Sequence, residues 1–110
     1  MNITQTEKYT QIKPIDNSVE NFFKSFENQS TKFHKEHLII DFSEKINIKI
    51  EELLLFLKIS EQHRMSGTSF VIVYEGVEVD EIPDEINIVP TFIEAMDILE
   101  MDAIERDLGF

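Results

Sequence analysis

Hydrophobic and polar positions along the chain follow two periods in turn, which predicts alternating strands and helices. Three short, continuous apolar runs are typical of strands covered on both faces, at residues 37–42 (HLIIDF), 69–74 (SFVIVY) and 86–89 (INIV). A weaker alternation over residues 8–15 is closed by Pro14. Because proline cannot donate a backbone hydrogen bond, this segment is predicted to be an edge strand.

Three other segments repeat their apolar residues at helical spacing, over residues 19–27, 48–64 and 92–108. Asp16 or Ser18 can cap the first helix, and Gly67 supplies the positive φ that ends the second. The third helix opens with TFIE at residues 91–94. This is a capping box, in which the threonine hydroxyl and the glutamate carboxylate each accept a backbone amide hydrogen bond.

Strands that alternate with helices imply a mostly parallel sheet, because parallel neighbours need long crossover connections. We therefore expect one α/β domain spanning residues 1–110, with a mostly parallel four-stranded sheet, crossover helices and a C-terminal amphipathic helix. Hydrophobic residues make up 42% of the chain and charged residues 29%, which is the composition of a globular domain and not of a disordered chain.

Composition excludes several classes of site and partner. The chain has no cysteine, so disulfides, thiolate metal sites and cysteine nucleophiles are excluded. The first residues are polar and no apolar run approaches about 18 residues, which predicts a cytoplasmic protein without a signal peptide or a membrane span. A formal net charge of -12 argues against nucleic acid or an anionic membrane as a partner of this acidic protein.

The acidic charge is concentrated in the last third of the chain. Residues 75–110 contain twelve acidic residues and a single base, Arg106. Several of the acids fall in the C-terminal half of the last predicted helix, where the helix dipole disfavours anions by about 0.3–1 kcal/mol each. These are Glu100, Asp102, Glu105 and Asp107. The segment is therefore either a solvated acidic surface or a docking face for a basic partner.

Candidate catalytic and metal-binding groups are sparse. His34 and His37 are three residues apart at a loop-to-strand junction, where two histidines without a third fixed ligand bind a metal weakly. The acidic run at residues 78–85 lacks EF-hand spacing and is interrupted by Pro83. His63 is expected at a helix C-terminus, where the dipole favours a cationic imidazole. We predict no catalytic residue, no metal and no cofactor from these patterns.

The second helical segment carries more apolar residues than one sheet face can cover. Leu54, Leu55, Phe56 and Ile59 occupy successive angular positions around it. Either the phenylalanines of the first helix cover the surplus, or the surplus forms an exposed apolar patch of the kind that marks a partner site.

Taken in order, the segments HLIIDFS, ELLLFL, SFVIVY, INIV and TFIEAMDIL resemble the STAS domain, the fold shared by anti-sigma factor antagonists and the cytoplasmic tails of sulfate transporters. In that family a strand ending in Asp-x-Ser leads into a helix, and the last helix opens with a Thr-x-x-Glu-Ala-like box. The resemblance covers residues 37–99. It implies a regulatory module whose partner is a protein, either a regulatory kinase or an anti-sigma-like factor.

The resemblance places a partner-binding site where the Asp-x-Ser strand turns into the helix, with polar residues at its rim and with Ile48 and nearby apolar residues supplying contact area. The residues at this position are Asp41, Ser43, Asn47, Ile48 and Glu51. Antagonists of the family carry a phosphorylatable serine or threonine beside a glycine here, whereas this chain has EKINI at residues 44–48. The usual phosphoserine switch is therefore not expected, and Ser43 is the remaining candidate for phosphorylation.

These observations predict a non-catalytic, STAS-like regulatory module that binds a protein partner or itself. One alternative is a small enzyme, because the chain also resembles small STAS-like proteins of Bacteroidetes that end in a tail like EMDAIERDLGF, some of which are named ribonuclease Z. That activity needs a His-x-His-x-Asp-His metal motif on a much larger scaffold, and this chain has three histidines. The other alternative is a structural homodimer joined through the second helix.

Overall fold

A mixed sheet of five strands organises the chain, in the order β1-β2-β3-β4-β5. The computed structural model describes residues 1–15, 17–44, 47–76 and 79–109. β1 pairs antiparallel with β2, and each of the other neighbouring pairs is parallel. The strands are β1 (Asn2–Gln5), β2 (Thr10–Lys13), β3 (Leu38–Asp41), β4 (Phe70–Val73) and β5 (Asn87–Val89).

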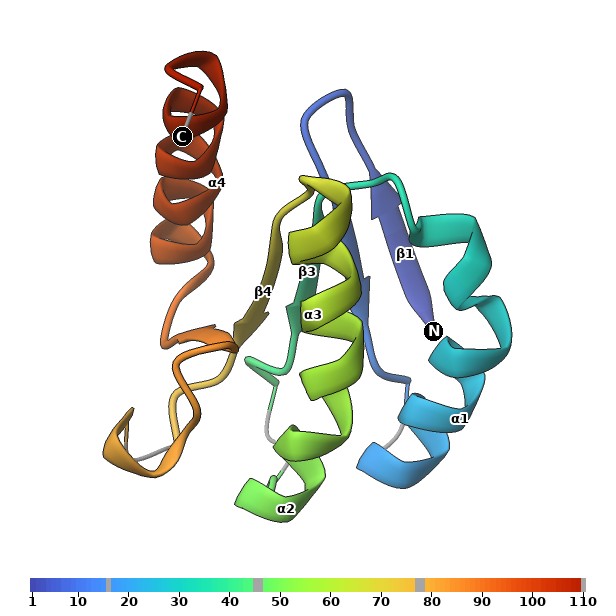
Figure 1. Ribbon diagram of the computed structural model, residues 1–110. Coiled ribbons are helices and arrows are strands. Elements are labelled where there is room, and N and C mark those ends of the chain that lie inside the picture. Colours follow the sequence, from blue (N-terminus) through green and yellow to red (C-terminus); the bar gives the residue numbers. More distant parts are fainter. Residues whose placement is uncertain (16, 45–46, 77–78, 110) are drawn as a thin grey trace.

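Helical segments connect the parallel strands (Figure 1). In chain order they are α1 (Val19–Gln29), the 3-10 turn η1 (Ser30–Phe33), α2 (Ile50–Leu53), the 3-10 turn η2 (Leu54–Phe56), α3 (Leu57–Ser66), the 3-10 turn η3 (Val79–Glu81) and α4 (Phe92–Asp107). α1 precedes β3, the α2–η2–α3 segment joins β3 to β4, and α4 follows β5. The α/β class with crossover helices is confirmed.

The sheet has one strand more than the four predicted. β1 is exposed along its whole length, so its sequence carries no burial signal. Because β1 pairs with the outer side of β2, β2 lies inside the sheet, and the prediction of an edge strand over residues 8–15 is wrong. Pro14 follows the last residue of β2, where its missing N–H interrupts no ladder.

The sheet separates two hydrophobic cores. The larger core lies under α1 and α3, which stand side by side on one face of the sheet (Figure 1). At its centre the Phe56 ring is fully buried among the rings of Phe22, Phe23, Phe26, Phe42 and Phe70. The smaller core lies on the opposite face, under α4, and is formed by Ile39, Val71, Val73, Ala95 and Leu99.

α4 covers only part of its face of the sheet. Strand pairing places Gln11 beside Ile39, so Gln11 and Lys13 point to the α4 side. Both are polar and half-buried, and the β1 residues paired with them, Asn2 and Thr4, are polar as well. The β1–β2 half of this face is therefore hydrophilic.

The helix ends agree with the predicted caps where the structure describes them. Ser18 Oγ accepts a hydrogen bond from a backbone amide of the first turn of α1 at 3.1 Å, while the alternative cap, Asp16, lies outside the described residues. Thr91 Oγ1 accepts the Glu94 amide at 3.2 Å, which is one of the two hydrogen bonds of the predicted capping box. Gly67 ends α3 with φ 76°, a conformation that favours glycine.

Candidate functional site

The predicted partner-binding residues lie where β3 ends and the chain turns into α2. We name this region the β3–α2 corner and define it as residues 41–44 and 47–55. It lies at the carboxyl end of the parallel strands, where open α/β sheets usually carry their ligand sites. The start of α1 and the turn η3 lie at the same end of the molecule (Figure 1).

Asp41 fixes the geometry of the corner from inside. It is the last residue of β3 and only 4% exposed, so it does not lie at the rim as expected. Its carboxylate accepts hydrogen bonds from Gln11 Nε2 at 2.7 Å and from the Ser43 backbone amide at 2.9 Å. A buried carboxylate without such donors would be costly, so these two bonds account for its position.

Ile48 does not supply contact area, and that prediction is wrong. Its side chain is 9% exposed and packs in the larger core. Its backbone amide donates a hydrogen bond to the Tyr74 hydroxyl at 3.1 Å. Tyr74 follows the last residue of β4, so this bond ties the β3–α2 connection to the neighbouring strand. Sequence reasoning missed Tyr74 because no local pattern signals a contact between residues 26 positions apart.

Ser43, Asn47 and Glu51 are exposed, which places these three predicted residues on the surface of the corner. The start of α2 is held by the Lys49 backbone amide, which donates to Glu52 Oε1 at 3.0 Å. Lys49 is basic and Glu51 is acidic, and both are exposed. The surface of the corner therefore carries charges of both signs, unlike the acidic last third of the chain.

The apolar surplus of the second helical segment divides into two halves. Phe56 and Ile59 are buried, because the aromatic rings of α1 and the sheet cover that side of the segment. Leu54 and Leu55, in contrast, are 39% and 42% exposed. Two adjacent leucines in the turn that follows α2 thus give the corner an apolar component in addition to its polar residues.

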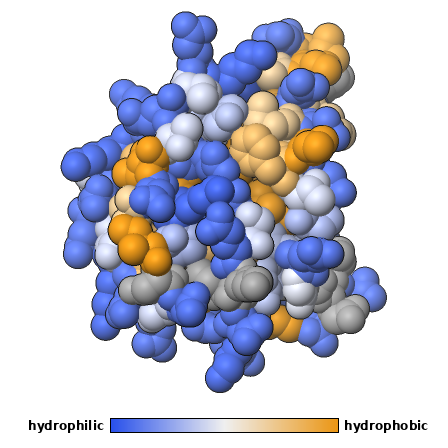
Figure 2. Space-filling view, turned by 180° about the vertical axis from the view of Figure 1, so that it is seen from behind, coloured by the Kyte–Doolittle hydropathy of each residue, from blue (hydrophilic) through white to orange (hydrophobic). Residues whose placement is uncertain are grey.

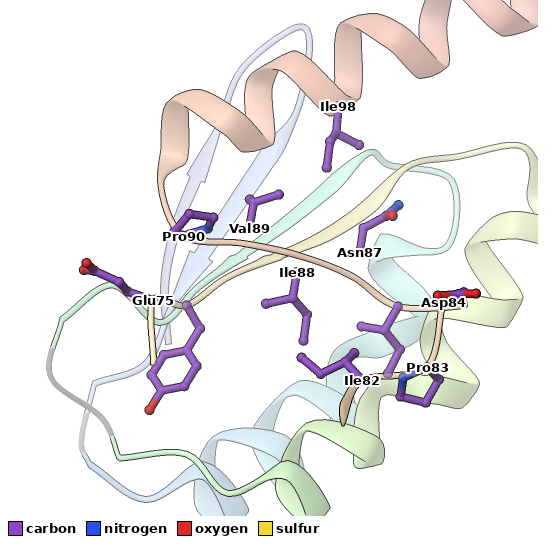
Figure 3. A pocket seen from close by; sticks show the side chains of 11 residues that line it. Glu75, Ile82, Pro83, Asp84, Asn87, Ile88, Val89, Pro90 and Ile98 are labelled. Carbon is purple, nitrogen blue, oxygen red and sulfur yellow. The ribbon is translucent and has the colours of Figure 1, made fainter. Parts of the chain in front are cut away.

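Tyr74 also lines a cavity of about 390 Å³ beside the corner, a volume within the range of ligand pockets (Figure 3). The cavity lies along β5, the edge strand of the sheet. Ile82 and Ile88 point to the same side of β5 as Tyr74, whereas Val89 and Ile98 lie on the α4 side (Figure 3). The polar lining residues are Glu75, Asp84 and Asn87.

His37 is part of a hydrogen-bonded group at the opposite, amino-terminal end of the parallel strands. Its Nδ1 accepts a hydrogen bond from the Ser69 backbone amide at 3.0 Å, and the Ser69 hydroxyl donates to Asp102 Oδ2 at 2.6 Å. Burial lowers the pKa of His37; Arg106 lowers it further, and Asp102 opposes both effects. The group ties α4 to the sheet.

His63 is not the cationic, dipole-stabilised residue that its helix-end position predicted. It is buried, its ring lies 5.5 Å from that of Phe70, and its Nδ1 is 2.7 Å from Thr68 Oγ1. Burial lowers the pKa of His63 to about 4, with smaller contributions from His34 and His37. Desolvation therefore outweighs the helix dipole at this position.

Among the residues that the structure describes, no three histidine or carboxylate side chains come together as a metal site would require. His34 is exposed. Of the acidic run at residues 78–85, Glu78 lies outside the described residues.

No protein-family model matches the chain, and no curated protein matches it. Within the described ranges, no helix is both long and apolar enough to cross a membrane. The function of the corner must therefore be inferred from its residues and their geometry.

Proposed function

We propose that the chain is a non-catalytic, STAS-like regulatory module that binds a protein partner through the β3–α2 corner. The observation that carries this proposal is the combination of exposed Ser43, Asn47 and Glu51 with two partly exposed leucines on one connection. Protein-binding surfaces commonly pair apolar contact area with a polar rim in this way. Leu54 and Leu55 take the contact role that the sequence had assigned to Ile48.

Hydrogen bonds to described residues of the corner support the same proposal. Asp41 holds the Ser43 amide, and Tyr74 holds the Ile48 amide, so two neighbouring strands each fix one of these residues. Residues that are already held in place lose less conformational entropy when a partner binds. The cavity that Tyr74 shares extends the available surface toward β5, where a partner side chain could enter.

The order of elements along the chain supports the STAS-like part of the proposal. A strand that ends at Asp41, with Phe42 and Ser43 directly after it, is followed by a helix, two further parallel strands and a capped final helix. In this interpretation the partner is a regulatory kinase or an anti-sigma-like factor.

Ser43 is the residue through which such binding could be regulated. It is exposed, and its backbone amide is bonded to the Asp41 carboxylate. Phosphorylation would add close to two negative charges next to Asp41 and Glu44. Repulsion among these charges would weaken binding to an acidic partner and would disturb the turn itself.

The test uses the intact chain as bait in a lysate of its own cells, followed by purification of the captured partner and measurement of its Kd. Replacing both leucines (Leu54→Asp with Leu55→Asp) should weaken binding by at least about tenfold, because charge then replaces apolar contact area. Ser43→Glu should weaken binding to an acidic partner. Met65→Asp is the matched control, since Met65 is 88% exposed at the far end of α3.

A purified partner that binds wild-type chain and both corner variants equally would refute the proposal. The structural homodimer gives a different result, because Leu54 and Leu55 would then contact a second copy. Sedimentation would show a dimer of the wild-type chain that the double leucine variant dissociates, and no other protein would compete for the surface.

A further inference from the structure

The outer side of α4 carries an apolar stripe that none of the described residues covers. Ile93, Met101, Ile104 and Leu108 are 74%, 60%, 58% and 65% exposed. The first three lie in α4 and Leu108 is its C-cap residue. Figure 2 shows hydrophobic surface, interleaved with hydrophilic side chains, along the edge of the molecule that α4 occupies.

Helical geometry places these residues on one side of α4. At about 100° per residue, the four side chains fall within roughly 80° of the helix circumference. Ala95 and Leu99, which face the smaller core, lie on the other side of the helix. α4 is thus apolar on two opposite sides, and only one of them is packed against the sheet.

Carboxylates flank the exposed stripe on both sides, and one of them, Asp97, lies within it between Ile93 and Met101. The exposed acidic residues of α4 are Glu94, Asp97, Glu100, Glu105 and Asp107. In the part of the chain that the structure describes, no lysine, arginine or histidine forms an ion pair with any of them. Arg106, the base of this segment, lines two cavities on the sheet side of α4, one together with Glu105 and the other together with Glu100, and forms no ion pair with either. Three of these acids are in the C-terminal half of the helix, where the helix dipole disfavours them.

We infer that the outer side of α4 binds a basic amphipathic helix, with the apolar residues of that helix on the stripe and its lysines or arginines on the surrounding carboxylates. The stripe runs over sixteen residue positions, from Ile93 to Leu108, or roughly 22 Å of helix. That length accommodates about four turns of a partner helix. The surface is separate from the β3–α2 corner, so this inference does not depend on the function proposed for the corner.

The negative charge of the carboxylates beside the stripe favours a basic helix over other occupants. A second copy of α4 would bring two sets of unpaired carboxylates together, which repels at short range. An anionic membrane would be repelled for the same reason. A basic helix gains contact area and charge complementarity at once.

The test uses synthetic helical peptides of about five turns as probes. One has leucines along one side flanked by lysines, and its partner peptide carries glutamates in place of the lysines. Fluorescence anisotropy should show binding of the lysine peptide only, with an affinity that falls as salt screens the carboxylates. The double variant Met101→Ser with Ile104→Ser should weaken binding by about tenfold.

Two control variants separate this surface from general attraction to an acidic protein. Met65→Ser removes an exposed methionine from α3, and Glu20→Gln with Glu27→Gln removes two carboxylates from α1, and both should leave the affinity within about twofold. Glu100→Gln with Asp107→Asn should weaken it. Equal losses in the α1 and α4 charge variants, or unchanged binding by the Met101 and Ile104 double variant, would overturn the inference. A dimer of the chain alone that this double variant dissociates would overturn it in favour of a second copy.

Discussion

The hydroxyl of Tyr74 accepts a hydrogen bond from the backbone amide of Ile48 at 3.1 Å, so the end of β4 holds the connection that leaves β3. Ile48 fills the larger core at the same point. The exposed residues that follow along α2 and η2 thus start from a position that this hydrogen bond and the core packing fix. This relationship places residues 49–55 of the corner relative to the sheet.

Tyr74→Phe should loosen the corner with little effect on the rest of the fold. The variant removes the acceptor of the Ile48 amide and keeps the ring, so we expect a loss of about 1 kcal/mol in the free energy of unfolding. Hydrogen exchange of the Ile48 amide should become faster, which NMR would detect. Tyr9→Phe is the control, because Tyr9 packs against Phe92 on the other face of the sheet. Unchanged exchange at Ile48 would show that the bond does not hold the corner.

Ser69→Ala should weaken the attachment of α4 to the sheet. The Ser69 hydroxyl is buried and donates to Asp102 at 2.6 Å, and without it the half-buried carboxylate loses a donor. Hydrogen bonds to charged groups contribute about 1.5–3 kcal/mol, so urea unfolding should show a loss of that size. Ser66→Ala, at an exposed position three residues earlier, should change stability by less than about 0.5 kcal/mol. Equal effects of the two variants would contradict this account of Ser69.

Phe56→Ala should cost about 3–5 kcal/mol, because it opens a cavity at the centre of the aromatic cluster. Leu55→Ala, one residue earlier, should cost less than about 1 kcal/mol, since that side chain is 42% exposed. Urea unfolding of both variants measures the contrast. A cost at Leu55 close to that at Phe56 would mean that Leu55 is packed in solution and is not free to contact a partner.

The free energy of unfolding should decrease as the pH is lowered, because of the titration of His63. Its pKa is about 4 in the folded chain and returns to about 6.5 on unfolding, so between these values the unfolded chain binds a proton that the folded chain excludes. The contribution of His63 to the free energy of unfolding is fully present above about pH 6.5. It is lost as the pH drops toward 4, by up to about 3 kcal/mol. His63→Gln should flatten this dependence of the free energy of unfolding, whereas His34→Gln, which removes only one of the smaller contributions to the pKa of His63, should leave most of it in place. A slope that both variants share with the wild type would exclude His63 as its source.

The strands that are buried on both faces could be predicted from the sequence, because continuous runs such as FVIV leave few other interpretations. β1 could not be predicted. Its residues are exposed on both faces, and it is held by its pairing with β2, which leaves no pattern of burial in the sequence. The position of β2 inside the sheet could not be predicted either, because it depends on the pairing of β2 with β1.

Asp41 could be placed at the end of a strand from the sequence, but which residues of the corner face inward could not. Whether Asp41 and Ile48 face inward depends on Gln11 and Tyr74, which are distant in the sequence. Helical spacing likewise could not decide which half of the apolar surplus is covered. That depends on where the rings of α1 pack, and they cover Phe56 but not Leu55.

The most direct test of the proposed function is site-specific photo-crosslinking of the intact chain in its own cells. A photoreactive residue is placed singly at position 43 or 55 in the corner, or at position 65 at the far end of α3 as the reference. We predict that the same partner protein is crosslinked from positions 43 and 55 and not from position 65. A partner captured from position 65 and from neither corner position would contradict the claim that the β3–α2 corner is the binding surface.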